Sequence, residues 1–256
     1  MTGAQGAGPR LVHIVRHPIK SVGHEALDHA SLLPGHMLPG DRAWAVAHSA
    51  ARLDGYGGWS PKGNFLRGVT GAALMAVRAE SGPWGLRLHH PHAATLEIDP
   101  DTPAGAAALI AWLEPLWPEG APRPARLVRA PATGLGDVPD PWVSVLSLAS
   151  LRALGQRLGM PLSIHRFRGN LWLDGLAPWE EFDLIGRRLR VGDAVLELRE
   201  AITRCKATTA NPDTGRFDAD TLGALELAYG RTDFGVYAEV VEGGPVRRGD
   251  AVTVLA

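Results

Sequence analysis

The sequence of 256 residues contains a single cysteine, Cys205. One thiol cannot form an internal disulfide, and it cannot supply a four-cysteine iron–sulfur cluster or a zinc site with several cysteine ligands. Any redox chemistry must therefore use a bound cofactor or this one thiol.

The sequence also lacks long apolar runs, and its net charge is close to zero. Apolar stretches such as 71–77 and 104–113 are shorter than the ~20 residues that span a bilayer, so no membrane span is expected. The Gly- and Ala-rich residues 1–9 do not resemble a signal peptide, so we expect a cytoplasmic protein. The net charge of −1 excludes a global field that would hold nucleic acid.

Several common site motifs are absent as well. The sequence contains no Walker loop, G-x-G-x-x-G, H-E-x-x-H or G-x-S-x-G motif, which excludes the usual nucleotide, zincin and hydrolase interpretations. His89, His90 and His92 lie close together, but no carboxylate stands at ligand spacing, so they do not predict a metal site.

Short alternating apolar runs separated by Gly and Pro dominate the sequence and predict a mainly β fold with some α (α+β). Gly-Asp pairs at 192–193 and 249–250 predict hairpin turns. Apolar spacing and caps predict three helices, over 102–116, 148–158 and 220–229. Strands are predicted at 11–15, 43–47, 74–77, 86–88 and 125–129.

A change in composition divides the chain. Six prolines fall within 118–141, where the packing unit is expected to change. We therefore predict an N-terminal β-barrel domain over 1–120. The second domain, over 121–256, is predicted to be a β-barrel with small flanking helices.

The thiol lies in the segment Ile-Thr-Arg-Cys-Lys-Ala-Thr-Thr-Ala-Asn-Pro-Asp-Thr-Gly, 202–215, between Arg204 and Lys206. Flanking cations favour a thiolate, which binds soft metals or attacks electrophiles. In an extended segment, however, both cations would point away from the face of Cys205. A lone cysteine is commonly a small buried hydrophobe, so the spacing leaves both roles open and favours packing.

Basic and hydroxyl side chains follow the first predicted strand. Lys20 and Ser21 come directly after it, and Arg42 follows after a turn. Such groups are suitable phosphate ligands, although each basic residue could equally be a solvated surface charge. Arg166 and Arg168 share one face of a predicted extended segment, where they could clamp an anion or be ordinary surface arginines.

Taken in order, these pieces resemble the MOSC family, which is related to the mitochondrial amidoxime-reducing component and to the C-terminal domain of molybdenum-cofactor sulfurase. The resemblance covers nearly the whole chain and identifies 121–256 as the MOSC domain. Its motifs are Pro-Ile-Lys-Ser at 18–21, Gly-Asp-Arg at 40–42, Ser-Leu-Ala-Ser-Leu at 147–151, Arg-Phe-Arg-Gly-Asn at 166–170, Trp-Glu-Glu at 179–181, Arg-Cys at 204–205, Asn-Pro-Asp-Thr-Gly at 211–215 and Phe-Gly-Val-Tyr at 234–237.

The resemblance implies a molybdenum ion bound by the dithiolene of a pterin, with Cys205 as the protein ligand of the metal. It places five residues around the phosphate and ring of the pterin, namely Lys20, Ser21, Arg42, Arg168 and Asn170. It carries over five further cofactor-binding residues, namely Ser147, Thr203, Arg204, Thr208 and Thr209.

The implied function is a molybdenum-dependent oxidoreductase that reduces N-hydroxylated or N-oxide compounds, with Cys205 at the catalytic centre. Electrons would come from a separate partner, a flavoprotein reductase with a small electron carrier. The alternative is a non-redox carrier that holds molybdenum cofactor, or sulfur as a persulfide on Cys205, for another enzyme.

Overall fold

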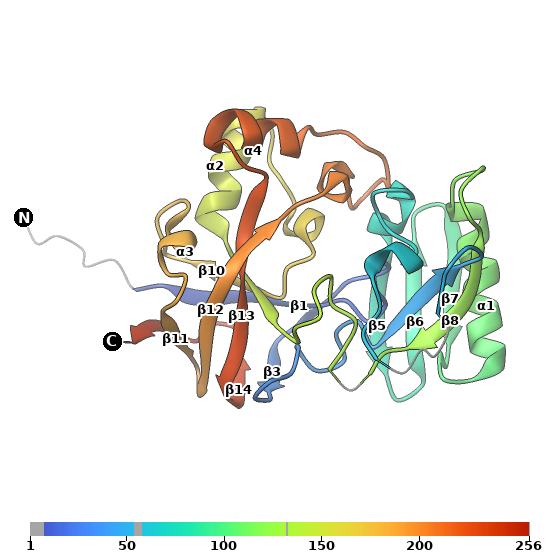
Figure 1. Cartoon of the computed structure of the whole chain (residues 1–256), viewed down its shortest axis with the longest axis horizontal. Coiled ribbons are helices and arrows are strands. Elements are labelled where there is room, and N and C mark those ends of the chain that lie inside the picture. Colours follow the sequence, from blue (N-terminus) through green and yellow to red (C-terminus); the bar gives the residue numbers. More distant parts are fainter. Residues whose placement is uncertain (1–7, 54–57, 132, 256) are drawn as a thin grey trace, which may run out of the picture.

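The computed structural model describes residues 8–53, 58–131 and 133–255. Residues 1–7, which belong to the N-terminal segment discussed above, lie outside the described residues. Strands make up 37% and helices 22% of the structure, which confirms the predicted mainly β fold. Two lobes lie side by side along the longest axis of the molecule (Figure 1).

The larger lobe is built on an eight-stranded sheet with the order β15-β11-β12-β13-β9-β10-β1-β2. All neighbouring pairs are antiparallel except β9 and β10, which are parallel. The strands are β1 (Arg10–Arg16), β2 (Glu25–Leu27), β9 (Val143–Ser147), β10 (Leu171–Asp174), β11 (Arg188–Val191), β12 (Ala194–Thr203), β13 (Asp233–Glu242) and β15 (Val252–Leu255).

The sheet closes on itself, because the start of β1 also lies beside the segment that leads into β15. Arg10 forms a bridge with Ala251, and the backbone N–H of Leu11 donates to Asp250 O over 2.9 Å. The N–H of Val252 donates to Pro9 O over 2.8 Å. This lobe is therefore a barrel made of strands from both ends of the chain.

The barrel interior explains the alternating sequence pattern. Val236, Ala238 and Val240 on β13 are buried at every second position, because successive side chains of a strand point to opposite faces. Leu189 and Val191 on β11 meet them in the same apolar cluster, which also includes Leu11 and Ile14 from β1. Burial of these apolar side chains is the main force that holds the barrel together. A two-stranded sheet of β3 (His29–Leu32) and β14 (Gly244–Arg247) lies at its edge.

Helices cover one end of the barrel lobe (Figure 1). Helix α2 (Leu148–Leu158) begins at Ser147, whose side chain accepts from Ser150 N, and ends at Gly159 in the left-handed conformation that glycine tolerates. The other short elements are α3 (Glu180–Asp183), α4 (Thr221–Tyr229), η4 (Ile164–Phe167) and η5 (Lys206–Thr209).

In its described part, the smaller lobe contains two small sheets, one α-helix and three 3-10 turns. Its own core includes Leu74, Leu88, Leu109 and Trp117. The elements are β4 (Trp44–His48) paired with β8 (Pro124–Arg129), the sheet β5 (Arg78–Gly82), β6 (Gly85–His90) and β7 (Ala93–Ile98), the helix α1 (Pro103–Leu113), and the single turns η1 (Lys62–Asn64), η2 (Ala72–Ala76) and η3 (Glu114–Leu116).

Three sequence-based expectations are wrong. The run 74–77 lies largely in the 3-10 helix η2 and not in a strand, because an unbroken apolar run fits a buried turn as well as a buried strand. The turn at 249–250 joins strands that pair elsewhere, β14 with β3 and β15 with β11. The segment 164–167 is a 3-10 helix and is not extended.

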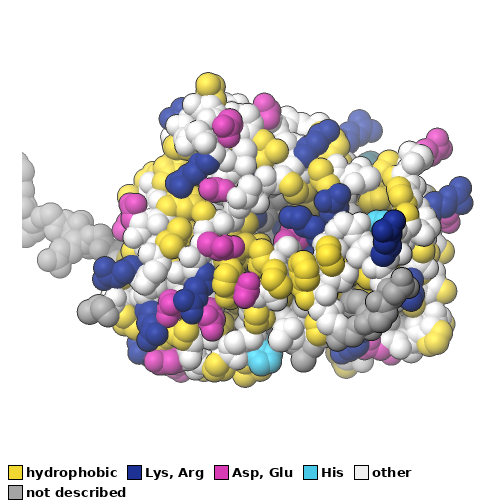
Figure 2. Space-filling view, viewed as in Figure 1, with side chains coloured by type: hydrophobic (Ala, Val, Ile, Leu, Met, Phe, Trp, Pro, Cys, Tyr) yellow, Lys and Arg dark blue, Asp and Glu magenta, His cyan; other side chains and the backbone are white. Residues whose placement is uncertain are grey.

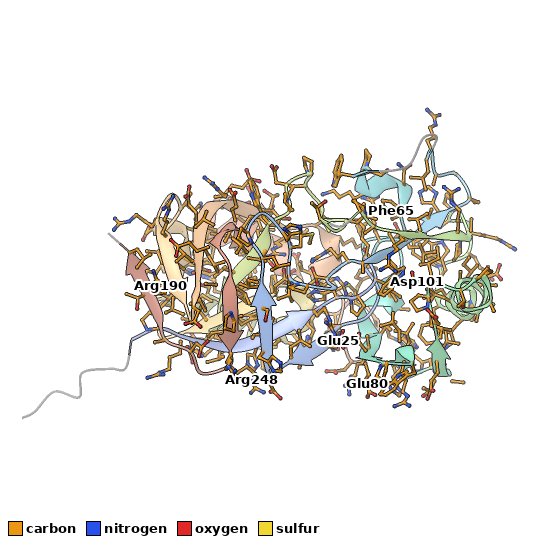
Figure 3. All side chains as sticks on the ribbon, turned by 90° about the horizontal axis from the view of Figure 1, so that it is seen from below. Glu25, Phe65, Glu80, Asp101, Arg190 and Arg248 are labelled. Carbon is orange, nitrogen blue, oxygen red and sulfur yellow. The ribbon has the colours of Figure 1, made fainter. Side chains whose placement is uncertain are left out.

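The barrel lobe contains strands from both sides of the predicted domain boundary at residue 120. Strands β1 to β3 pair within the barrel lobe, so this lobe draws on residues far before the predicted boundary at residue 120. Glu25 lies between the lobes (Figure 3) and accepts from Arg16 Nε over 2.7 Å and from Ser81 Oγ over 2.7 Å. The division into 1–120 and 121–256 stays a prediction.

Candidate functional site

A cavity of about 280 Å³ lies between the lobes, and most of the predicted site residues line it. The space-filling view shows a hollow near the middle of the molecule with Lys and Arg side chains around it (Figure 2). The predicted residues that line the cavity are Lys20, Ser21, Arg42, Arg168, Asn170, Thr203, Arg204, Cys205 and Thr208.

Three of these residues have an unusual backbone. Ser21, Arg42 and Arg168 have φ angles of 62°, 49° and 47°, in the left-handed region that side chains other than glycine rarely adopt. Such backbone strain concentrates at functional sites, where the surrounding contacts maintain it. Here each strained residue lies at a point where the chain turns at the cavity wall.

Arg42 is held by two buried neighbours. Its guanidinium donates to Asp41, and Asp41 also accepts from His17 N over 2.6 Å. Burial alone would raise the pKa of Asp41, but Arg42 and His17 hold it well below its usual range. Burial and the positive charge of Arg168 lower the pKa of His17 to about 3, so its imidazole is neutral.

Arg168 and Arg204 carry positive charge without a hydrogen-bonded carboxylate among the described residues. Arg168 donates to Gly23 O and Ile19 O over 3.1 and 3.3 Å. Arg204 donates to Phe234 O and Phe167 O, each over 2.8 Å. Burial lowers the pKa of Arg168 to about 9 and that of Arg204 to about 10, so both stay charged at neutral pH. Two cations without a bonded counter-ion make this cavity suitable for an anion.

Lys20 differs from these arginines because its donors are all in use. It is only 2% exposed, and its Nζ donates to Leu135 O over 3.1 Å, Gly136 O over 2.9 Å and Asp137 Oδ1 over 2.6 Å. Burial lowers the pKa of Lys20, while Asp137 opposes the shift. Lys20 thus anchors the wall segment 135–137 in this structure.

Cys205 is exposed and precedes the turn η5 at the cavity wall. The interpretation of this thiol as a small buried hydrophobe is therefore wrong. The carbonyl of Cys205 accepts from Thr208 N over 3.1 Å, and the hydroxyls of Thr208 and Thr221 lie 2.6 Å apart. These contacts fix the loop while leaving the sulfur accessible.

Other predicted residues have structural partners. Asn170 Nδ2 donates to Val15 O over 3.1 Å, and its Oδ1 accepts from Ser144 Oγ over 2.9 Å, so it ties three strands together at the cavity. Thr203 donates to Asp233 over 2.8 Å. Ser147 and Thr209 do not line the cavity. Ser147 caps α2, and the Thr209 hydroxyl donates to Lys206 O. The cofactor contacts expected of Ser147 and Thr209 stay predictions.

A family model described as the MOSC domain matches residues 135–253. This part of the chain is a MOSC domain. Its matched residues include Arg168, Asn170, Arg204 and Cys205, whereas Lys20, Ser21 and Arg42 lie outside them. The cavity is therefore completed by residues that precede the MOSC domain in sequence.

Curated relatives share part of this chain. Mitochondrial amidoxime-reducing component 1 of Mus musculus is 34% identical over 123 residues, which are 43% of this chain and 36% of that protein. Molybdenum cofactor sulfurase of Drosophila grimshawi is 30% identical over 94 residues, which are 36% of this chain and 12% of that protein. The match thus covers well under half of either relative.

A solved structure, the YuaD protein from Bacillus subtilis, resembles the whole chain more distantly. It covers 95% of this chain and 93% of its own, with 13% identity and a TM-score of 0.46.

Sequence reasoning missed several residues around the MOSC domain cavity. Asp137 lies in the Pro-rich segment that composition marked as a boundary, so nothing identified it as a wall residue. Tyr237 appeared only as part of a motif, yet it lines the cavity, and burial raises the pKa of its phenol. Arg166 also lines the cavity, but its guanidinium is paired with Asp218 over 2.7 Å.

No helix in the described part of the chain is long and apolar enough to cross a membrane. The described residues also contain no group of three or more His, Cys, Asp or Glu side chains that could hold a metal ion by themselves.

Proposed function

We propose that this chain binds a molybdenum–pterin cofactor in the cavity between the lobes and reduces N-hydroxylated or N-oxide compounds. The observation that carries the proposal is that the exposed thiol of Cys205 lines the same cavity as guanidinium groups that have no carboxylate partner among the described residues. The shared MOSC domain and the names of the two relatives support the choice of cofactor and substrate class.

The chemistry of the cavity wall fits such a group. Phosphate is a dianion that prefers planar, charged donors, and Arg168 has N–H groups to spare beyond its contacts with backbone carbonyls. A soft thiolate such as that of Cys205 suits a metal with sulfur ligands. The volume of about 280 Å³ is near the lower end of the roughly 300–1,000 Å³ typical of ligand sites.

The roles of the residues follow from their positions. Arg42, Arg168 and Ser21 would hold the phosphate end of the cofactor. Lys20 would also bind the phosphate once one of its three present acceptors leaves. Asn170 and Arg204 would stabilise the loops around the ring, with Thr203 and Thr208 close to Cys205. Cys205 would be the protein ligand of the metal. When bound, the cofactor supplies the two-electron reduction that removes oxygen from nitrogen.

The overall reaction needs two electrons and two protons for each N–OH group that becomes N–H and water. The chain has one cysteine, so it has no cysteine-bound iron–sulfur cluster with which to store these electrons. We therefore propose a separate electron donor, a flavoprotein reductase with a small electron carrier. The cytoplasmic location expected from the sequence stays a prediction.

The exposure of Cys205 favours a second candidate, a carrier that holds sulfur as a persulfide or passes on molybdenum cofactor. An exposed thiolate can take the outer sulfur of a donor persulfide, with release of the donor's thiol, and pass it on by the same exchange without any metal. The metal content of the purified chain distinguishes the reductase from the sulfur carrier. A near-stoichiometric amount of molybdenum is expected for the reductase, whereas persulfide without metal supports the sulfur carrier.

The substitution Cys205→Ser tests the metal ligand. It keeps nearly the same volume and replaces a soft thiolate by a hydroxyl that stays protonated near neutral pH. The variant is expected to fold normally and to lose reduction of an amidoxime substrate by orders of magnitude in an assay with a supplied reductase and electron carrier. Wild-type turnover with an unchanged molybdenum X-ray absorption spectrum would contradict both the ligand and the reaction.

A further inference from the structure

The ammonium group of Lys20 has no donor left for a ligand in this structure. It has three N–H groups, and these are matched by three acceptors, Leu135 O, Gly136 O and Asp137 Oδ1. Because Lys20 is only 2% exposed, a ligand can approach it only through the cavity that it lines. A new anion can bind Lys20 directly only if one of the present acceptors leaves.

Asp137 is the acceptor that can leave at the lowest cost. The two carbonyls belong to the buried backbone of Leu135 and Gly136, which cannot move without displacing the wall itself. The side chain of Asp137 is 50% exposed, so its carboxylate can rotate into solvent about its own side-chain bonds. No other hydrogen bond of this carboxylate is found among the described residues.

The charges around Asp137 are those of an anion site. Arg42, Lys62 and Arg168 line the same cavity, and Arg42 and Lys62 both act on this carboxylate. Partial desolvation alone would raise the pKa of Asp137, but Lys20, Arg42 and Lys62 hold it well below its usual range. The side chain therefore carries a full negative charge at neutral pH.

We propose that Asp137 is an internal counter-anion, which occupies the third donor of Lys20 until the phosphate group of a ligand displaces it. The inference rests on the proposed function, since it assumes an anionic ligand in this cavity. The exchange replaces one anion on Lys20 by another, so the buried ammonium never loses its counter-charge. Ligands without a strong anion cannot make the exchange, and Asp137 thus selects for phosphate-bearing ligands.

The test uses the full chain purified free of cofactor, with inorganic phosphate as the probe in isothermal titration calorimetry at low ionic strength. Asp137→Asn keeps an oxygen that can accept from Lys20 and removes the negative charge. Because a competing charged acceptor is lost, the variant is expected to bind phosphate about tenfold more tightly than wild type.

Asp140→Asn is the matched control. Asp140 lines the same wall, but it is not among the acceptors of Lys20. Its substitution removes one negative charge without freeing a donor, and the gain in affinity is expected to be much smaller than for Asp137→Asn. Equal gains in the two variants would mean that only the overall charge of the cavity matters and would overturn the proposal.

A double-mutant cycle tests whether the effect passes through Lys20. In a Lys20→Met background, Asp137→Asn is expected to give no more gain than Asp140→Asn gives in wild type. A tenfold gain that persists without the ammonium would overturn the proposal. If neither wild type nor Asp137→Asn binds phosphate, the anion site of the proposed function is itself contradicted.

A crystal structure of the wild-type chain with phosphate gives a second measurement that does not depend on the folding of any variant. A phosphate oxygen is expected within hydrogen-bond distance of Lys20 Nζ, with the Asp137 carboxylate turned away. Phosphate bound to the arginines while Lys20 still contacts Asp137 would contradict the exchange and leave the anion site intact.

Discussion

His17 Nδ1 lies 3.2 Å from Asp41 Oδ1, and neither side chain is exposed to solvent. The same carboxylate accepts from the guanidinium of Arg42, which lines the cavity. The contact between His17 and Asp41 therefore helps to fix the orientation of Arg42, which we propose binds the phosphate group. Because a neutral histidine can donate to Asp41 without adding charge, the negative charge of Asp41 remains available to Arg42.

Asp41→Asn is expected to lower the free energy of unfolding by about 3 kcal/mol, because it leaves the guanidinium of Arg42 without its buried partner. Urea denaturation at pH 7.5 measures this. The control is Asp174→Asn, which breaks an exposed ion pair with Arg152 and is expected to cost less than about 1 kcal/mol. Similar losses in the two variants would contradict the importance of the buried arrangement.

Acid should destabilise the chain through His17. Its pKa is lowered by burial from 6.5 to about 3, so the folded state binds its proton less readily than the unfolded state. The contribution is fully present above pH 6.5 and is lost as the pH falls toward 3, by about 1.4 kcal/mol per pH unit. Denaturation at pH 7.5, 6.5 and 5.5 measures the slope.

The control for this slope is His17→Asn, whose side-chain amide can replace Nδ1 as a donor to Asp41 and does not titrate. Burial also lowers the pKa values of His24 and His165, so the variant will still lose stability in acid. Its loss should be smaller than that of wild type by the amount assigned to His17. Parallel pH curves for the two proteins would refute this assignment.

Glu181 should have the opposite effect. It is 1% exposed and accepts from Ser150 Oγ over 2.7 Å, and its other oxygen has no hydrogen-bond partner among the described residues. Burial raises its pKa from 4.5 to about 6, so the folded state favours the protonated form and stability falls as the pH rises from 4.5 to 6. Glu181→Gln is expected to stabilise the chain by about 2 kcal/mol at pH 8.

The gain from Glu181→Gln should disappear near pH 4, where the carboxyl is protonated in both the folded and unfolded states. Asp183→Asn changes an exposed carboxyl of the same helix α3 and should have little effect at either pH. A stabilisation by Glu181→Gln that is equal at both pH values would show that charge burial is not its cause.

Arg168→Ala is expected to weaken the binding of inorganic phosphate by about tenfold or more, because it removes a charge-assisted contact. Arg157→Ala removes an exposed arginine of α2 outside the cavity and should leave phosphate affinity unchanged. Calorimetric titration of the two variants compares them directly. Equal affinities would remove Arg168 from the anion site.

The accessibility of Cys205 predicts its reactivity. In the cofactor-free folded chain, one thiol should react with Ellman's reagent nearly as fast as in urea, because Cys205 is exposed. Cofactor binding should slow the reaction if the thiol becomes a metal ligand. A thiol that reacts only after unfolding would contradict the exposure of this side chain.

Sequence periodicity predicted the helices and strands whose apolar pattern and capping residues lie within the element itself. Helix α2 could be predicted with both ends, because Ser147 and Gly159 are capping residues beside a clear apolar stripe. The barrel closure could not be predicted, since it depends on hydrogen bonds between residues 9–11 and 249–252, which no local pattern reports.

The candidate site shows the same limit. The resemblance supplied Cys205, Lys20 and Arg168, which the structure brings to one cavity. Asp137 gave no local signal, because its importance comes from a lysine that is distant in sequence. All donors of Lys20 are occupied, whereas Arg168 keeps N–H groups beyond its contacts with Gly23 O and Ile19 O. This difference is a property of the packed loops and could not be predicted from residue types.

The closed barrel also affects the order in which the chain can fold. The end of β1 can pair early with β2, but β10 begins at Leu171 and β15 at Val252, so the rest of β1 must wait for partners that are distant in sequence. Contacts between residues so distant in sequence slow folding, because the intervening chain must first be ordered. Until those partners are in place, β1 is paired only through its short contact with β2, and its remaining edge can attach to another chain. We therefore expect the closing contacts between residues 9–11 and 249–252 to form late in folding.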